Sequence, residues 1–168
     1  MTGSAGRVSR AAAGSALFFV LAPGVVAGLI PWWLTGWERE ELWAPLRVVG
    51  GALLVVGLAV LLHAFARFVV EGLGTPAPVA PTEHLVVGGL YRYVRNPMYL
   101  AVLAAIVGQA LLLGQLELLA YAAVVALAFV AFVHWYEEPT LHRQFGEEYE
   151  TYRRQVPGWI PRLRRNRR

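Results

Sequence analysis

Long apolar stretches dominate the pattern of hydrophobic and polar positions along the chain. Four of them stand out, at residues 11–34, 46–70, 98–113 and 118–136. A helix of roughly 20 apolar residues crosses about 30 Å of hydrocarbon, so each stretch predicts a transmembrane helix. Only Gly114–Glu117 separate the last two stretches, which predicts a tight hairpin of antiparallel helices.

The segments around these stretches are polar or rich in proline. Pro76, Pro78 and Pro81 exclude a regular helix before the third stretch and predict an extended chain there. After the fourth stretch, apolar and aromatic positions recur at helical spacing over residues 141–156. This spacing predicts one amphipathic tail helix, which Pro157 ends.

Composition and charge agree with a membrane protein. Hydrophobic residues make up 57% and charged residues 15% of the chain, whereas soluble domains are about one quarter charged. Arginines lie at the N-terminus, in the second loop and in the tail, whereas the first loop carries mainly glutamates. Because basic loops stay on the cytoplasmic side, we expect both termini in the cytoplasm, in a multi-pass protein of the inner or plasma membrane.

The predicted fold is therefore all-α and integral to the membrane, with a single domain over residues 1–168. It has about four transmembrane helices, a C-terminal helical hairpin and a cytoplasmic amphipathic tail helix. The first apolar stretch is too long for a cleaved signal peptide, and further spans follow it, so we expect it to be retained.

Several kinds of chemistry are excluded or disfavoured. The chain has 0 cysteines, which excludes disulfides, thiolate metal sites and a cysteine nucleophile. Its four histidines lack the spacing of a zinc helix, so we expect no metal. The arginine-rich tail could contact nucleic acid, but beside membrane spans we interpret it as binding anionic membrane lipids.

The first candidate site surrounds the start of the third apolar stretch. Pro97 suits the first turn of a helix and Asn96 its N-cap, so a positive helix end should lie at the membrane surface. Arg95 adds a planar donor fork for a carboxylate or phosphate, and Tyr91 and Tyr99 add flat aromatic faces. These residues could hold an anionic, aromatic ligand, or they could only anchor the helix among lipid headgroups.

The second candidate site lies where the fourth apolar stretch ends. The neighbouring carboxylates of Glu137 and Glu138 repel each other, so a cation should compensate them. The hairpin should bring Arg95 to the same end of the protein, where it faces the pair across one pocket; the alternative is a solvated pair. His134 could accept a proton beside this pair. Gln109 lies inside the third stretch, where it could bind a ligand or a neighbouring helix.

Two separated motifs make the chain resemble a known enzyme family. Residues 85–99, LVVGGLYRYVRNPMY, and residues 137–157, with Phe-Gly-Glu-Glu-Tyr in the middle, resemble the two signatures of the isoprenylcysteine carboxyl methyltransferase family. The resemblance covers residues 82–163. The sequence departs from the usual pattern at Asn96, where the family has a histidine, and at Val133, where eukaryotic members have an arginine for the substrate carboxylate.

The resemblance implies methyl transfer from S-adenosylmethionine to a lipophilic or prenylated acceptor that enters from the bilayer. This acceptor could be a prenylcysteine carboxylate, a phospholipid amine or another lipid. The cofactor would lie at the cytoplasmic end of the hairpin. By position in the two motifs, the implied cofactor-binding residues are Tyr91, Arg95, Asn96, Tyr99, Gln109, Glu137 and Glu138. The catalytic candidates are His134 and Glu138.

Two other functions remain as alternatives. Membrane sterol-type reductases have a similar C-terminal ending but use NADPH, and the basic residues expected for a 2′-phosphate are not evident here. A small membrane scaffold without enzymatic activity is the third interpretation. Binding of S-adenosylmethionine or of NADPH would distinguish the three.

Overall fold

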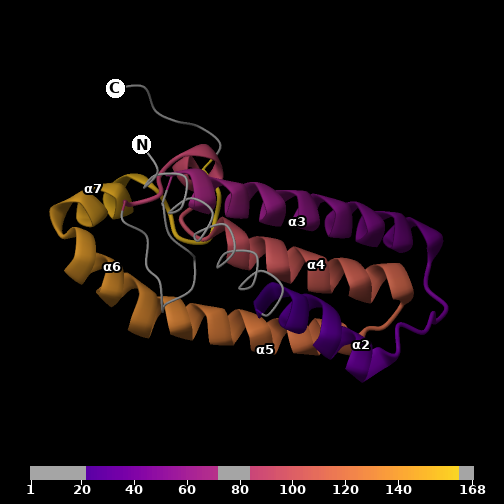
Figure 1. Ribbon diagram of the computed structural model, residues 1–168. Helices are drawn as coiled ribbons and strands as arrows, with labels where there is room; N and C mark the ends of the chain where they lie inside the picture. The colour runs from indigo at the N-terminus through magenta and orange to yellow at the C-terminus, as the bar shows by residue number, and fades with distance from the viewer. Residues whose placement is uncertain (1–21, 72–83, 163–168) are drawn as a thin grey trace, which may run out of the picture.

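The computed structural model describes residues 22–71 and 84–162, and all regular structure in these ranges is helical. The predicted extended segment at residues 76–81 lies outside them. Figure 1 shows a bundle of long helices with a smaller helical unit at one end. In chain order the elements are η1 (Val25–Leu29), α2 (Ile30–Thr35), α3 (Ala44–Glu71), η2 (Gly89–Arg92), α4 (Pro97–Leu113), α5 (Glu117–Phe132), η3 (Val133–Glu137), α6 (Glu138–Phe145) and α7 (Glu147–Gln155).

Helices α3 and α4 pack backbone against backbone. A Cβ atom added to Gly50 of α3 would lie 2.4 Å from the Leu112 nitrogen, and one added to Gly108 of α4 would lie 2.7 Å from the Leu54 nitrogen. Gly57 makes a third close approach, to the carbonyl oxygen of Ala101. Small residues at a helix interface are typical of membrane proteins, where close packing replaces the hydrophobic effect as the driving force.

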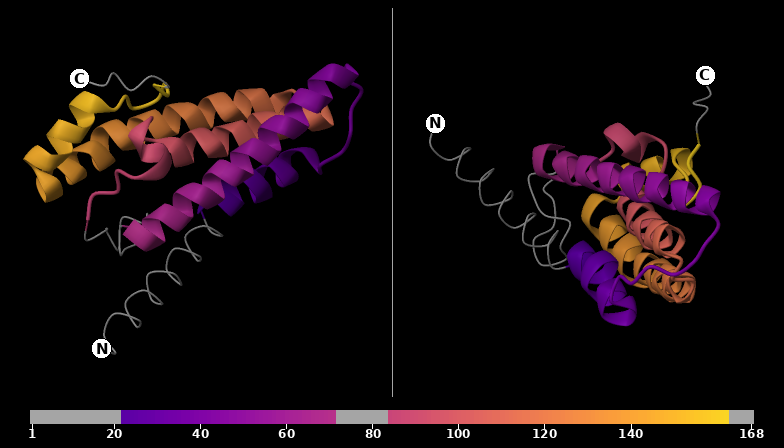
Figure 2. Two further views of the ribbon diagram at one scale, coloured as in Figure 1. Left: turned by 90° about the horizontal axis from the view of Figure 1, so that it is seen from above. Right: turned by 90° about the vertical axis from the view of Figure 1, so that its right-hand side faces the viewer.

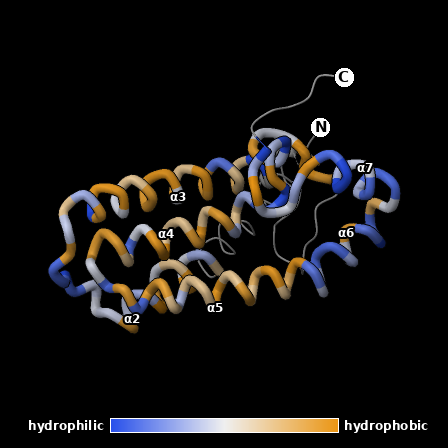
Figure 3. The backbone as a smooth tube through the Cα atoms, turned by 180° about the vertical axis from the view of Figure 1, so that it is seen from behind, coloured by the Kyte–Doolittle hydropathy of each residue, from blue (hydrophilic) through white to orange (hydrophobic). Residues whose placement is uncertain are grey.

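Most of the apolar surface of the bundle faces outward. The helical stretches 44–67 and 117–145 are long and apolar enough to cross a membrane, yet only 28% and 22% of their most apolar windows are buried inside the protein. Val55 and Leu127, for example, are 68% and 71% exposed. Figure 3 shows hydrophobic positions along the helices and hydrophilic ones towards their ends. Such a surface suits hydrocarbon as its solvent.

The other two predicted spans correspond to shorter apolar helices, at residues 22–35 and 97–113. Residues 11–21 of the first predicted span lie outside the described residues. The arrangement of four transmembrane helices therefore stays a prediction, whereas two helices meet the length and composition of a membrane span.

The α4–α5 connection lies at the end of the bundle opposite the terminal helices α6 and α7 (Figures 1 and 2). Gly114 ends α4 in the left-handed conformation, and a Cβ atom there would lie 2.7 Å from the carbonyl oxygen of Glu40. The Glu40 N–H donates to the Leu113 carbonyl over 2.8 Å, and the Gln115 amide donates to the Glu38 carbonyl over 3.0 Å. The loop after α2 therefore covers this connection. We call this part of the molecule the turn end.

The C-terminal part differs from the prediction in two respects. The helix of α5 continues past residue 136 through η3 and α6 to Phe145, because the wider π-helical turn of η3 precedes Pro139 and accommodates its ring. The interpretation of residues 141–156 as one helix is wrong. Gly146 separates α6 from α7 with φ 51° and ψ −121°, a conformation that favours glycine.

Candidate functional site

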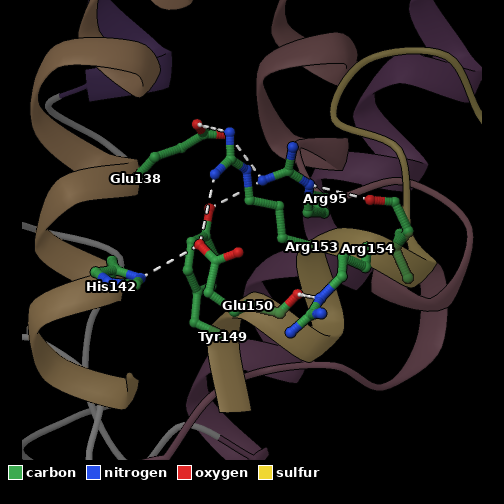
Figure 4. Close-up of polar contacts among 8 residues, drawn as sticks. Arg95, Glu138, His142, Tyr149, Glu150, Arg153 and Arg154 are labelled. Carbon is green, nitrogen blue, oxygen red and sulfur yellow. Dashed lines mark hydrogen bonds and ion pairs between the residues drawn. The ribbon is translucent and has the colours of Figure 1, made fainter. Parts of the chain in front are cut away.

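A partly buried ion pair joins the start of α4 to the start of α6. The Arg95 Nη1 lies 2.7 Å from the Glu138 Oε1, and the two side chains are only 14% and 18% exposed. Figure 4 shows them approaching from different elements. Arg153 of α7 adds a second cation, 3.7 Å from the other carboxylate oxygen of Glu138. The negative charge at the helix end that carries Glu137 and Glu138 is therefore compensated by arginines from two other segments.

Tyr149 of α7 belongs to the same polar cluster. Its hydroxyl oxygen accepts a hydrogen bond of 2.9 Å from the Arg95 Nη1. Burial raises the pKa of Tyr149 to about 12, although the nearby guanidinium of Arg95 acts in the opposite direction. The phenol therefore stays protonated at neutral pH. Because its oxygen accepts from Arg95, its own proton remains available to donate.

The chain after α7 pairs with the segment that precedes α4. We call residues 156–162 the C-terminal strap. The backbone nitrogens of Arg95 and Asn96 donate to the carbonyls of Pro157 and Gly158 over 2.9 and 3.2 Å, and the Arg162 nitrogen donates to the Tyr93 carbonyl over 3.0 Å. The Arg95 Nε donates to the Val156 carbonyl over 3.1 Å. The strap thus fixes both the backbone and the side chain of Arg95.

Tyr99 and Glu137 form a second polar contact beside the ion pair. The Tyr99 hydroxyl donates to the Glu137 Oε2 over 2.6 Å. The Tyr99 ring lies against Phe129, with centroids 4.7 Å apart, and near Trp159 of the strap, with centroids 6.2 Å apart. The two glutamates thus have different partners: Glu138 pairs with arginines, and Glu137 accepts from a phenol.

Asn96 has an unpaired polar atom in a buried position. It is only 6% exposed, and as the N-cap residue of α4 it makes no capping hydrogen bond with its side chain. Among the described residues, two buried side-chain nitrogens lack a hydrogen-bond partner, Asn96 Nδ2 and Arg47 Nε. Arg47 still donates to the Glu40 carbonyl through another nitrogen. An unpaired buried donor costs about 1–3 kcal/mol, so a ligand acceptor at Asn96 would be favourable.

Gln109 lies towards the turn end, away from this cluster. It follows Pro97 by more than three helical turns of α4, which corresponds to about 18 Å along the axis. Its Oε1 accepts from the Trp37 indole over 3.1 Å, and its Nε2 donates to the Ala27 and Ala105 carbonyls over 2.7 and 3.2 Å. The Ala27 carbonyl belongs to η1, whose Val26 carbonyl accepts from the Tyr121 hydroxyl over 2.8 Å. Gln109 therefore helps to fasten η1 to the bundle.

Tyr91 and His134 are the remaining predicted residues. Tyr91 is buried, and its carbonyl accepts from the Tyr152 hydroxyl over 2.7 Å. His134 is exposed on η3, with its ring 6.3 Å from that of Trp135. Of the predicted site residues, the structure brings together Arg95, Asn96, Tyr99, Glu137 and Glu138. Their roles in binding or catalysis stay predictions.

Sequence reasoning missed that the strap and Tyr149 contact Arg95. The sequence places Tyr149 in the predicted tail helix and in the second motif without a partner, and nothing in it singles out Gly158. The motif Val156-Pro157 was the available signal, because it places an extended segment directly after a helix. The sequence contained no signal for the partner of that segment, since the paired residues are about 60 positions apart.

The comparisons with known proteins assign the chain to a family. The profile of the phospholipid methyltransferase family matches residues 46–148, which is more than half of the chain. The chain belongs to the phospholipid methyltransferase family. The matched region begins in α3, earlier than the 82–163 expected from the motifs, so it includes most of α3 as well as α4 and α5.

A curated relative supports the resemblance to the isoprenylcysteine carboxyl methyltransferases. Over 80 residues the chain is 36% identical to a protein-S-isoprenylcysteine O-methyltransferase of Schizosaccharomyces pombe. The similar region covers 47% of this chain and 34% of the relative, so the chain matches about a third of that protein's length. No solved structure matches the chain. The family expected from the two motifs is thereby confirmed.

Proposed function

We propose that this protein transfers methyl groups from S-adenosylmethionine to a lipophilic acceptor at the cytoplasmic face of a membrane. The observation that carries the proposal is the partly buried cluster around Arg95 and Glu138, with both signs of charge, in a chain of the phospholipid methyltransferase family. A cofactor with a carboxylate, an ammonium and a sulfonium needs a site with both signs of charge.

The cluster supplies a partner for each part of the cofactor. Arg95 would bind the carboxylate through its planar fork, and Glu138 would accept from the ammonium or the ribose hydroxyls. Tyr99 and Trp159 supply aromatic surfaces for the adenine ring. The unpaired Nδ2 of Asn96 adds a further donor. In the described structure Arg95 and Glu138 bind each other, so the cofactor would insert into or share this pair.

Bound S-adenosylmethionine supplies a methyl group on a positively charged sulfur. The acceptor forms a bond to the methyl carbon while the carbon–sulfur bond breaks, and sulfur keeps the electron pair. The protein must align the two partners and exclude water, which requires no metal or covalent intermediate. A carboxylate acceptor needs no base. An amine acceptor must lose a proton, and His134 or Glu138 would accept it.

The acceptor would come from the membrane itself. The long apolar faces of α3 and α5 are exposed, and they suit lipid contact around the cluster. The family's name points to a phospholipid amine, whereas the fission yeast relative is named for an isoprenylcysteine carboxylate. Val133 occupies the position where the sequence comparison led us to expect an arginine for that carboxylate. This departure favours a phospholipid amine as acceptor.

A binding experiment in detergent tests the proposal. Calorimetry with S-adenosylhomocysteine, the demethylated product, should show binding to the purified protein, whereas NADPH should give no heat beyond dilution. Phosphatidylethanolamine and N-acetyl-S-farnesylcysteine are then offered as acceptors with labelled S-adenosylmethionine. Binding of NADPH without a response to S-adenosylhomocysteine would instead support the sterol-type reductase, which the family assignment does not favour.

A further inference from the structure

The turn end exposes a group of large aromatic side chains. Four of the 6 tryptophans of the chain fall within residues 32–43, in α2 and in the loop that follows it. Trp33 and Trp43 are 75% and 70% exposed, and Trp32 and Trp37 are about half exposed. We call these four residues the turn-end tryptophans. Because a surface in water rarely carries so many large aromatic side chains together, they indicate an interaction surface.

The loop that carries these side chains is held in one conformation. Trp37 has a φ of 56°, a left-handed conformation that a bulky residue adopts only where its surroundings hold it. Its indole nitrogen donates to the Gln109 Oε1 over 3.1 Å, and its backbone nitrogen donates to the Thr35 Oγ1 over 3.2 Å. Glu40 bonds the same loop to the α4–α5 connection. The exposed indoles therefore extend from a fixed platform.

Charged residues lie among the turn-end tryptophans. Glu38, Arg39, Glu40 and Glu41 are all exposed in the same loop. Indoles beside charged side chains are typical of the boundary between hydrocarbon and water, because the ring suits the apolar side and the indole N–H the polar side. The exposed apolar faces of α3 and α5 begin beside this loop. This continuity favours a lipid bilayer, and not a second protein, as the partner of the surface.

Exposed aromatic residues recur at the opposite end of the bundle. Trp135 and Tyr136 of η3 are 76% and 45% exposed. Helix α5 begins at Glu117 beside the turn end and continues directly into η3, so Glu117 and Trp135 are about 27 Å apart along the axis. This length matches the roughly 30 Å of hydrocarbon in a bilayer. Val124 and Leu127, which lie between the two ends, are 63% and 71% exposed.

We propose that the turn-end tryptophans lie at one membrane–water interface and that Trp135 and Tyr136 lie at the other, with hydrocarbon around the bundle between them. This placement rests on exposure and helix length, and not on the proposed function. Glu138 follows Trp135 by only about 5 Å of helix. The Arg95–Glu138 ion pair is therefore at the level of the lipid headgroups, and α6 extends into the water.

The placement also bears on the acceptor of the proposed methyl transfer. An acceptor atom that reaches the ion pair must itself lie at the headgroup level. The amine of a phospholipid lies at this level, whereas a group in the middle of the bilayer is too deep. A depth measurement that needs no cofactor tests the placement separately from the proposed function.

Spin labels at four exposed positions provide this measurement in the full chain. Because the chain has 0 cysteines, each of four substitutions introduces a single site for a nitroxide and leaves every tryptophan in place: Leu34→Cys, Leu127→Cys, Tyr136→Cys and Arg143→Cys. The labelled proteins are reconstituted into dioleoyl phosphatidylcholine vesicles. Electron paramagnetic resonance then gives the depth of each nitroxide from its relative exposure to oxygen and to a water-soluble nickel chelate.

The nitroxide at residue 127 should lie about 13 Å deeper than the one at residue 136, because nine residues of helix separate them. The labels at residues 34 and 136 should both lie at headgroup depth. Arg143→Cys is the reference for water, and its label should be fully accessible to the nickel chelate. A label at residue 34 or 136 that is as accessible as this reference would overturn the proposal. A label there that is as deep as the one at residue 127 would overturn it as well.

Fluorescence quenching tests the indoles themselves. Phosphatidylcholine brominated near the headgroup should quench the wild-type tryptophans more strongly than phosphatidylcholine brominated near the chain ends. Leu127→Trp is the matched control, because its added indole should be quenched mainly by the deep bromines. Stronger quenching of the wild type by the deep bromines would contradict the proposal. Absence of quenching by either lipid would also contradict it and would assign the turn-end tryptophans to a protein partner.

Neither readout depends on methyl transfer. A protein that gives the expected depths but binds no S-adenosylhomocysteine would refute the proposed function and support the placement. A protein that binds S-adenosylhomocysteine but gives the wrong depths would do the reverse.

Discussion

Helix α4 carries a buried amide side chain near each end, and the two amides differ in their hydrogen bonds. Gln109, near the turn end, uses both its oxygen and its nitrogen, with Trp37, Ala27 and Ala105 as partners. Asn96, at the start of the helix, has an Nδ2 without a partner and makes no capping bond. A satisfied buried amide fixes a structure, whereas an unsatisfied one costs stability until a ligand binds. The comparison therefore separates a fastening end of the bundle from the end where we propose that the cofactor binds, which we call the binding end.

The largest expected effect is a difference in labelling, because we predict that the two ends of the bundle lie on opposite sides of the membrane. The chain contains 0 cysteines, so single introduced cysteines report their own accessibility. Glu41→Cys at the turn end should react with a membrane-impermeant maleimide from outside intact cells. Glu148→Cys on α7 should react only after the membrane is opened, because we predict that the arginine-rich end is cytoplasmic. Labelling of both from the same side would refute the topology.

The second prediction concerns the charged residues of the binding end. Arg95→Ala and Glu138→Ala should each weaken binding of S-adenosylhomocysteine by about 2–5 kcal/mol, which is roughly 30-fold to several thousand-fold. The physical reason is that each truncation also leaves its former partner charged, partly buried and without its counter-ion. Calorimetry measures the affinity, and circular dichroism checks that the helices are retained.

Arg92→Ala is the matched control, because Arg92 lies close to Arg95 in the sequence but is exposed. It should bind S-adenosylhomocysteine like the wild type. If Arg95→Ala and Glu138→Ala also bind like the wild type, the ion pair is only structural and the site assignment fails.

The third prediction concerns the turn end, where a substitution should lower the stability of the protein and leave its cofactor affinity unchanged. Gln109→Leu removes the bonds to Trp37 and Ala27, so the variant should lose about 1–3 kcal/mol of unfolding free energy. Its affinity for S-adenosylhomocysteine should stay unchanged, because the amide lies far from Arg95. Thermal unfolding in detergent measures the first quantity and calorimetry the second. If Gln109→Leu instead lost affinity for S-adenosylhomocysteine at unchanged stability, Gln109 would belong to the cofactor site.

The smallest effect is expected for Tyr149→Phe. Loss of the acceptor for Arg95 should cost about 0.5–1.5 kcal/mol of stability at neutral pH. The pKa of Tyr149 is raised to about 12 in the folded protein, against about 10 for a free phenol. The folded state thus binds more protons between pH 10 and 12, so the wild-type unfolding free energy should decrease with rising pH in that range. The decrease should be shallower in Tyr149→Phe, and equal slopes would contradict the assignment.

Much of the helical frame was predictable because it follows local rules. Pro97 begins a helix and Gly114 ends it, as the residue types indicate. The short connection between α4 and α5 also explains why Arg95 and Glu138 could be expected at one end of the protein. The structure places their side chains 2.7 Å apart.

The features that the sequence did not predict depend on contacts between residues far apart in the chain. Pairing of the strap with residues 93–96 has no local pattern, and the break at Gly146 depends on a backbone angle that composition does not reveal. The sequence places Asn96 at a helix start and Gln109 inside an apolar stretch, but it names both as cofactor-binding candidates, because the partners of an amide side chain leave no local pattern. Only the hydrogen-bond partners distinguish them.

The central claim is that the protein transfers methyl groups to a lipophilic acceptor, and an assay of methyl transfer in membranes tests it most directly. Membranes containing the wild type or Arg95→Ala are incubated with S-adenosylmethionine labelled on its methyl group, and the lipids are then extracted into organic solvent. The account predicts label in the lipid fraction for the wild type, well above membranes without the protein, and background levels for Arg95→Ala. Background label for the wild type, or equal label for the variant, would contradict it.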